Sequence, residues 1–190
     1  DPARIAVVGA SNRASSFGAR VLENLRMFEG QVYPINPKYA ELGGLRCYPD
    51  LASLPHAPDL IVVAAPGEAL PGLVRDAVDV GAGSIVAFSA GFAETGDPEL
   101  RALQHRMAKM AAEGGVRMVG PNALGFVNYR ARINCTFVAD FPMPEPRPEA
   151  IGLVSQSGAI GLSLVQSVDR GVSFSHVLTC GNSADVDVCD

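Results

Sequence analysis

Five short apolar runs alternate with helix-like segments along the first two thirds of the chain. The runs cover residues 4–9, 31–35, 60–65, 84–88 and 116–119, and most are rich in valine, isoleucine and alanine. Runs of this length and composition are typical of strands that are buried on both faces of a parallel sheet. Because parallel neighbours need long crossover connections, this alternation constrains the fold more than any other feature of the sequence.

The segments between these runs have the spacing of amphipathic helices. Val21, Leu22 and Leu25 fall on one helical stripe, and Gly30 follows as a stop signal. Five strands joined by such crossovers predict an α/β fold with a doubly wound parallel sheet of the Rossmann type. The three predicted helices span residues 18–28, 67–80 and 98–112.

A proline-rich segment divides the chain. Residues 141–148 read FPMPEPRP, and the four prolines remove backbone donors and favour an extended conformation. We therefore predict a first domain over residues 1–141, a linker over residues 142–150 and one β-α-β unit of a second α/β domain over residues 151–190. About forty residues cannot close such a domain, so we expect the sequence to be a piece of a longer polypeptide.

The composition excludes several classes of protein. The net charge is −5 and the 15 basic residues are scattered, unlike the clustered basic face of a nucleic-acid-binding protein. No apolar stretch reaches the roughly 18 to 20 residues that a membrane span needs, and no signal peptide is recognisable, so we expect a soluble, cytoplasmic protein. The four cysteines and three histidines are isolated from one another, which predicts reduced thiols and no metal site.

The first strand-to-helix connection has the composition of a phosphate-binding loop. It reads GASNRASSFG from Gly9 to Gly18. Its small residues allow close approach of a pyrophosphate, the start of the next helix offers oriented N–H groups, and Ser11, Ser15 and Ser16 add hydroxyl donors. The loop lacks the G-x-G-x-x-G pattern, and a tight turn rich in small residues is the alternative interpretation.

The end of the second predicted strand carries a cation where many dinucleotide-binding domains carry an acid. The sequence there reads YPINPK and ends at Lys38, whereas NAD-binding domains place Asp or Glu there to accept the ribose hydroxyls. A lysine favours a ligand with an additional phosphate, which coenzyme A carries at the ribose 3′ position and NADP at the 2′ position. The alternative interpretation is a solvated surface charge.

Two further loops of small residues follow the fourth and fifth predicted strands. The first contains Phe88, Ser89 and Ala90 and the second contains Asn122, at the edge where doubly wound sheets bind ligands. Past the proline-rich segment, residues 155–159 read SQSGA between a strand and a helix, which suits a phosphoryl group. Turn formation and a plain serine N-cap are the corresponding structural alternatives.

These motifs together resemble one enzyme family. The stretches VVGAS, VLENL, YPINPKY, CYPDL, SAGFAE, GPNALG, VSQSGAIG and GNSADVD occur in this order and span nearly the whole sequence. The set is similar to the α-type subunit of NDP-forming acyl-CoA synthetases, close to ADP-forming acetate–CoA ligases and related to succinyl-CoA synthetase. The resemblance implies a Rossmann-type CoA-binding domain followed by the start of a flavodoxin-like, succinyl-CoA-ligase-like domain.

The resemblance also implies roles for individual residues. Taken with the residues singled out above, the predicted CoA contacts are Gly9, Ser11, Ser15, Ser16, Phe17, Gly18, Lys38, Phe88, Ser89, Ala90 and Asn122. The phosphate-handling helix of the family would begin at Ser157, Gly158 and Ala159. One departure is Ser183, which stands where many relatives carry a charged or longer polar residue.

The reaction that the resemblance implies joins a small carboxylate to CoA, converts NTP to NDP and phosphate, and passes through an acyl phosphate and a phosphohistidine. That histidine lies beyond the ADVD stretch in the family, and none of His56, His105 and His176 matches it. We therefore predict no catalytic residue in this chain. The resemblance further implies an oligomer and an ATP-grasp subunit or fused domain that binds ATP or ADP with Mg²⁺.

Two other functions are compatible with the same residues. A ligase-like region without catalysis can be the CoA-sensing, regulatory part of a protein lysine acetyltransferase. An NADP-dependent oxidoreductase is permitted by Lys38, but the sequence offers no constellation suited to hydride transfer.

Overall fold

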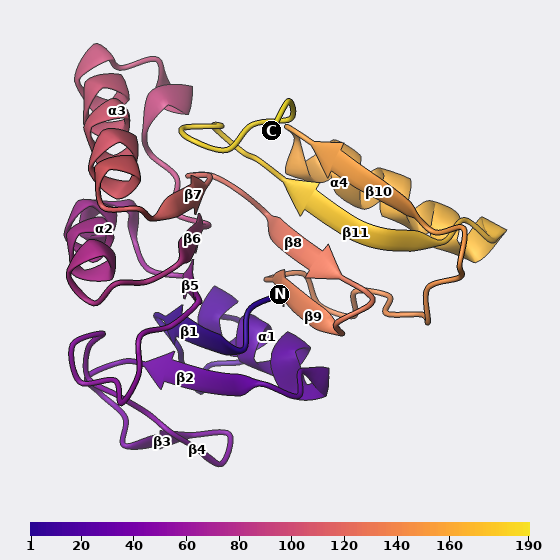
Figure 1. The fold of residues 1–190 in the computed structure, drawn as a ribbon, viewed down its shortest axis with the longest axis horizontal. Helices are drawn as coiled ribbons and strands as arrows, with labels where there is room; N and C mark the ends of the chain where they lie inside the picture. The colour runs from indigo at the N-terminus through magenta and orange to yellow at the C-terminus, as the bar shows by residue number, and fades with distance from the viewer.

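A five-stranded parallel sheet forms the centre of the first domain (Figure 1). The computed structural model describes all 190 residues. In the sheet the strands lie in the order β2-β1-β5-β6-β7, so the chain reverses its direction of winding between β1 and β5. The strands are β1 (Arg4–Val8), β2 (Gln31–Ile35), β5 (Leu60–Val63), β6 (Ser84–Ala87) and β7 (Arg117–Val119).

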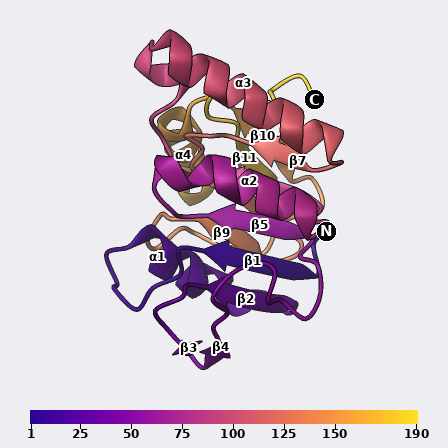
Figure 2. The ribbon, with the colours of Figure 1, turned by 90° about the vertical axis from the view of Figure 1, so that its left-hand side faces the viewer.

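Helices cover both faces of this sheet, as a doubly wound fold requires. Figures 1 and 2 show α2 and α3 on one face and α1 on the other. Leu70, Val74 and Met107 of α2 and α3 are fully or almost fully buried against one face, and Val21 of α1 is buried against the other. The predicted Rossmann-type fold is therefore confirmed. The helical segments are α1 (Phe17–Asn24), η1 (Leu25–Met27), η2 (Gly67–Ala69), α2 (Leu70–Asp79), η3 (Ala93–Thr95) and α3 (Pro98–Glu113).

A second sheet of mixed direction lies beside the first, with the order β10-β11-β8-β9. Its parallel pair, β10 (Ile151–Ser155) and β11 (Phe174–Thr179), is joined through α4 (Gly158–Val165) and η4 (Gln166–Arg170), as the sequence predicts. Strand β11 also pairs antiparallel with β8 (Gly125–Asn128), which pairs in turn with β9 (Ile133–Thr136).

The hairpin β8–β9 precedes the proline-rich segment in the sequence. It nevertheless belongs to the second sheet, whose other two strands, β10 and β11, follow that segment. The sequence predicts no strands here, because two four-residue strands carrying Asn128 and Asn134 give only a weak alternating pattern. No helix or strand occurs between β9 and β10. The linker over residues 142–150 and the domain limits on either side of it stay predictions. The hairpin of β3 (Glu41–Leu42) and β4 (Leu45–Arg46) was likewise not predicted.

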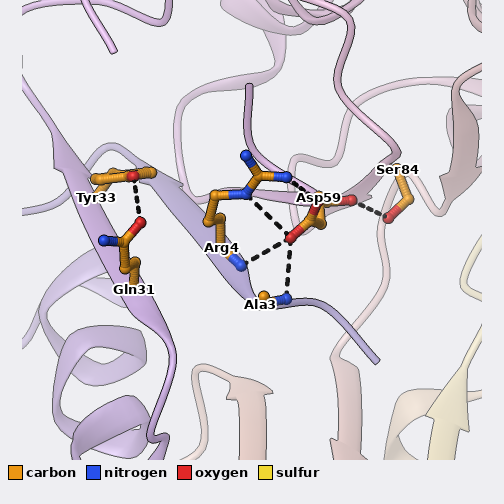
Figure 3. Close-up of polar contacts among 6 residues, drawn as sticks. All are labelled: Ala3, Arg4, Gln31, Tyr33, Asp59 and Ser84. Atoms are coloured by element: carbon orange, nitrogen blue, oxygen red, sulfur yellow. Dashed lines mark hydrogen bonds and ion pairs between the residues drawn. The ribbon is translucent and has the colours of Figure 1, made fainter. Parts of the chain in front are cut away.

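An ion pair joins the beginnings of β1 and β5 at the amino edge of the first sheet (Figure 3). Arg4 Nη2 lies 2.8 Å from Asp59 Oδ1, and Asp59 Oδ2 accepts hydrogen bonds from the backbone N–H groups of Ala3 and Arg4. Ser84 Oγ donates to the backbone oxygen of Asp59, which extends the contact to β6. These contacts fix the end of the sheet opposite to the predicted ligand edge.

The second unit exposes more apolar surface than the first. Ile151, Val154, Ile160 and Leu164 of β10 and α4 are each about half exposed, whereas most residues of β1, β5 and β6 in the first sheet are buried. No helix is both long enough and apolar enough to cross a bilayer. The four cysteine side chains are unpaired: Cys47, Cys135 and Cys180 are buried and Cys189 is exposed.

Candidate functional site

The loop from Gly9 to Gly18 begins at the point where the strand order reverses. It leaves β1 next to Ala64, which follows β5, so it lies at the switch point where doubly wound sheets bind ligands. Gly9 has a φ of +84°, and a Cβ there would lie 2.5 Å from the Ala64 oxygen. A Cβ on Gly18 would lie 2.1 Å from the Gly9 oxygen. Both glycines are therefore required for close packing of the loop and α1.

The polar groups of this loop divide into those already bonded and those free to bind a ligand. Ser16 caps α1, because its Oγ accepts from Ala19 N and donates to the Arg13 oxygen. Ser11 Oγ accepts from Arg13 N, and Ser15 is exposed. The amides of Phe17 and Gly18 precede the first hydrogen bond of the helix, from Arg20 N to the Ser16 oxygen. The loop contains no acidic residue, so its amides and hydroxyls suit an anion.

Lys38 lies at the end of β2, beside the loop at the end of β1. Its side chain is exposed and forms no ion pair with an acid. The Lys38 backbone N–H donates to Asn36 Oδ1, and Asn36 Nδ2 donates to the Ala10 oxygen at 2.7 Å. Asn36 therefore connects the lysine turn to the glycine loop, a role that the sequence analysis missed. The signal was present, because Asn often bonds backbone groups two residues ahead.

The loops that follow β6 and β7 meet at the same edge of the sheet. Asn122 N donates to the Ser89 oxygen at 2.8 Å, and the buried Ser89 Oγ donates to the Ala65 oxygen. Ala90 is exposed, and its oxygen lies 2.5 Å from the position that a Cβ on Gly67 would take. The predicted residues of these two loops therefore lie together along the carboxyl edge of the sheet. We call this edge, with the loops that follow β1, β2, β6 and β7, the rim.

Phe17 and Phe88 are connected by a third aromatic ring that was not predicted. Phe137, which follows β9, stacks on Phe17 with ring centroids 4.1 Å apart and meets Phe88 edge to face at 5.0 Å. Phe88 is buried, whereas Phe17 remains 44% exposed. Phe137 lies 120 residues after Phe17 in the sequence, so no local pattern could reveal the contact.

The second predicted phosphate site lies at the start of α4. Ser157 Oγ accepts from Ile160 N as the N-cap, and the Gly158 and Ala159 amides precede the first helical bond, from Gly161 N to the Ser157 oxygen. A Cβ on Gly158 would lie 2.9 Å from Leu124 Cβ, in the loop after β7. The start of α4 therefore lies next to the rim.

A separate groove of about 690 Å³ runs along α1 towards the β3–β4 hairpin. Among the predicted site residues it contacts Ser11 only, and its walls include Arg20, Glu23 and Leu42. Arg26 also lines the groove, but the groove touches none of the loops at the ends of β2, β6 and β7. The rim therefore remains the candidate site.

Two family models match the chain. The model described as CoA binding domain matches residues 3–129, and the model described as succinyl-CoA ligase like flavodoxin domain matches residues 148–190. Among curated proteins, a prokaryotic trans-feruloyl-CoA synthase is 40% identical over 96% of this chain and 26% of its own length. The ADP-forming acetate–CoA ligase I of Archaeoglobus fulgidus is 37% identical over the whole of this chain and 27% of its own length.

A solved structure has the same arrangement. The dinucleotide-forming acetyl-coenzyme A synthetase 1 of Ca. Korarchaeum cryptofilum, in complex with phosphate and ADP, aligns with a TM-score of 0.90 at 36% identity, over 99% of this chain and 40% of that one. The chain thus spans about a quarter of the length of the two curated relatives. Because the first family model covers well over half of the sequence, the chain belongs to the CoA binding domain family.

Proposed function

We propose that this chain is the CoA-binding portion of an ADP-forming acyl-CoA synthetase. The observation that carries the proposal is the order of groups along the rim. Lys38 lies at the end of β2, the glycine loop at the end of β1, and Ser89 and Asn122 at the ends of β6 and β7. This order supplies a cation, then free amides, then neutral polar groups. CoA carries its groups in the matching order: the 3′-phosphate, the pyrophosphate and the uncharged pantetheine arm.

We infer the direction in which CoA would lie from the same order. The 3′-phosphate would face Lys38, where a lysine with no acidic partner offers an ammonium group to an anion. The pyrophosphate would face the amides of Phe17 and Gly18 at the start of α1. The pantetheine arm, which carries no charge, would then run past Ser89 and Ala90 towards Asn122. This direction brings the thiol end towards α4.

The start of α4 would hold a phosphoryl group close to that thiol end. Ser157, Gly158 and Ala159 supply a hydroxyl and amides at a helix N-terminus, which suit the phosphate or acyl phosphate of this reaction. Polar residues in the chain would bind and orient the reactants. The phosphohistidine, and the ATP or ADP site with Mg²⁺ in an ATP-grasp subunit or fused domain, are proposed for the rest of an oligomeric protein.

The ligase activity is tested by comparing the encoded full-length protein with this 190-residue chain. Each is incubated with CoA, Mg²⁺-ATP and a panel of small carboxylates, including acetate and ferulate, and acyl-CoA and ADP are measured. We expect both products from the full-length protein and neither from the chain, which contains no matching histidine. CoA binding without acyl-CoA formation by the full-length protein would favour a regulatory role instead.

A further inference from the structure

Asn182, in the turn after β11, lies where three polar segments meet. Its Nδ2 donates to a carboxylate oxygen of Glu94 and to Gln104 Oε1 at 2.9 Å, and its Oδ1 accepts from Asn122 Nδ2 at 3.4 Å. Both functional atoms of the side-chain amide are therefore used. The partners come from the segment after β6, from α3 and from the loop after β7.

The backbone around Asn182 connects the rim to the second phosphate site. Asn182 N donates to the Pro121 oxygen at 2.9 Å, and a Cβ on Gly181 would lie 2.5 Å from that same oxygen. On the other side, Gly181 N donates to the Gln156 oxygen, and Gln156 Nε2 donates back to the Gly181 oxygen at 2.7 Å. Residues 181 and 182 thus contact both Asn122's loop and the loop that begins α4.

Glu94 extends the hydrogen bonds of Asn182 to the loop after β6. Its carboxylate accepts from the backbone N–H groups of Gly91 and Phe92, directly after Ser89 and Ala90. Partial burial opposes ionisation of Glu94, but hydrogen bonds from Asn182, Gly91 and Phe92 outweigh it and lower the pKa. A charged carboxylate is the form that can accept all of these bonds. Asn182 therefore contacts the loops at the ends of β6 and β7 together.

We propose that Asn182 is a positioning residue for the pantetheine arm of CoA, which it serves by holding these two loops against the start of α4. The inference rests on the proposed function. Asn182 forms no hydrogen bond with the Gly9–Gly18 loop or with the turn of Lys38, where the nucleotide end would lie. Loss of its side chain is therefore expected to weaken a ligand that carries the arm and to spare a ligand that lacks it.

The test compares CoA with adenosine 3′,5′-bisphosphate, which has the nucleotide end alone. Calorimetric titrations use the 190-residue chain and its Asn182→Ala variant. We expect the affinity for CoA to fall by about fivefold or more, the effect of about one net hydrogen bond, while the affinity for the bisphosphate stays within about twofold. Arg117→Ala is the matched control, because it removes ion pairs with Asp185 and Asp190 of the same C-terminal segment without altering the rim.

Glu94→Ala is the second variant, and it is expected to give the same selective loss because it releases the loop after β6 from Asn182. Equal weakening of both ligands in both variants would show a general structural effect and overturn the inference. Unchanged CoA affinity in both variants would also overturn it. Failure of the unaltered chain to bind CoA would contradict the proposed function, which separates the two outcomes.

Discussion

Phe17 of the glycine loop stacks on Phe137 with an interplanar angle of 15°. The two rings lie 120 residues apart in the sequence, and Phe137 also meets Phe88 at the end of β6. Phe137 therefore connects two predicted CoA-contact residues without having been predicted itself. Its ring orients the exposed Phe17 at the start of α1.

Replacing Phe137 tests this connection. Phe137→Ala is expected to lower the free energy of unfolding by about 2 kcal/mol, less than for a fully buried phenylalanine because Phe137 is only partly buried. It should also weaken CoA binding, since Phe17 loses the surface that orients it. Urea unfolding and calorimetry measure the two effects. Phe28→Ala removes a partly buried ring of the same hydrophobic cluster that is in no stack with Phe17. A similar loss of CoA affinity in that control would contradict the specific role of Phe137.

Because of the Arg4–Asp59 ion pair, we expect part of the free energy of unfolding to depend on pH in the acid range. The hydrogen bond from Arg4 is the largest cause that lowers the pKa of Asp59 below its ordinary value, so folding favours the charged carboxylate. The stabilisation is complete above the ordinary pKa of about 4 and is lost as the pH falls through the lowered value. Since both side chains are about one third exposed, solvent screens the pair and we expect a small contribution to the free energy of unfolding at neutral pH.

Asp59→Asn is the variant that tests this assignment. It should be less stable than the unaltered chain at pH 7, and the difference should shrink as the pH is lowered towards 3. Urea unfolding at a series of pH values measures it, with the exposed Asp79→Asn as a control outside any ion pair. A difference that stays constant over this range would contradict the linkage.

Two glycines in helices give opposite predictions. A Cβ on Gly18 would overlap the Gly9 oxygen, so Gly18→Ala is expected to cost about 1–3 kcal/mol and to disturb the glycine loop. Gly72 lies within α2 with no atom within 4 Å of its Cβ position, so Gly72→Ala should stabilise the chain by about 0.5–1 kcal/mol. Thermal unfolding separates the two variants, and equal destabilisation would show that the close approach at Gly18 is not what matters.

The elements of the first sheet could be predicted because each is a local pattern. The run LIVV at Leu60–Val63 is recognisable from four consecutive apolar residues, all of which prove to be buried, and the stripe of Val21 and Leu25 identifies α1. The strands of the β8–β9 hairpin could not, because they are short and weakly patterned, and because β11, the second partner of β8, follows the proline-rich segment.

The candidate site likewise contains residues that a local sequence pattern reveals and residues that it does not. Gly9, Ser89 and Asn122 occur at the ends of predicted strands, so the topology of a parallel sheet places them at one edge. The contacts of Phe137 and Asn182 depend on residues about 50 to 120 positions away, and neither has a local signature. These contacts form only because folding places the two sheets side by side.

The central claim is that the rim binds CoA with its 3′-phosphate at Lys38. Lys38→Ala should lower CoA affinity by about tenfold, as expected for loss of one charge-assisted contact, whereas Lys109→Ala on the exposed face of α3 should have no effect.

The most direct measurement is a calorimetric titration of the unaltered chain with CoA and with dephospho-CoA under identical conditions. We expect saturable, one-to-one binding of CoA and clearly weaker binding of dephospho-CoA. Equal affinity for the two ligands would remove the role given to Lys38, and no binding of either would contradict the central claim.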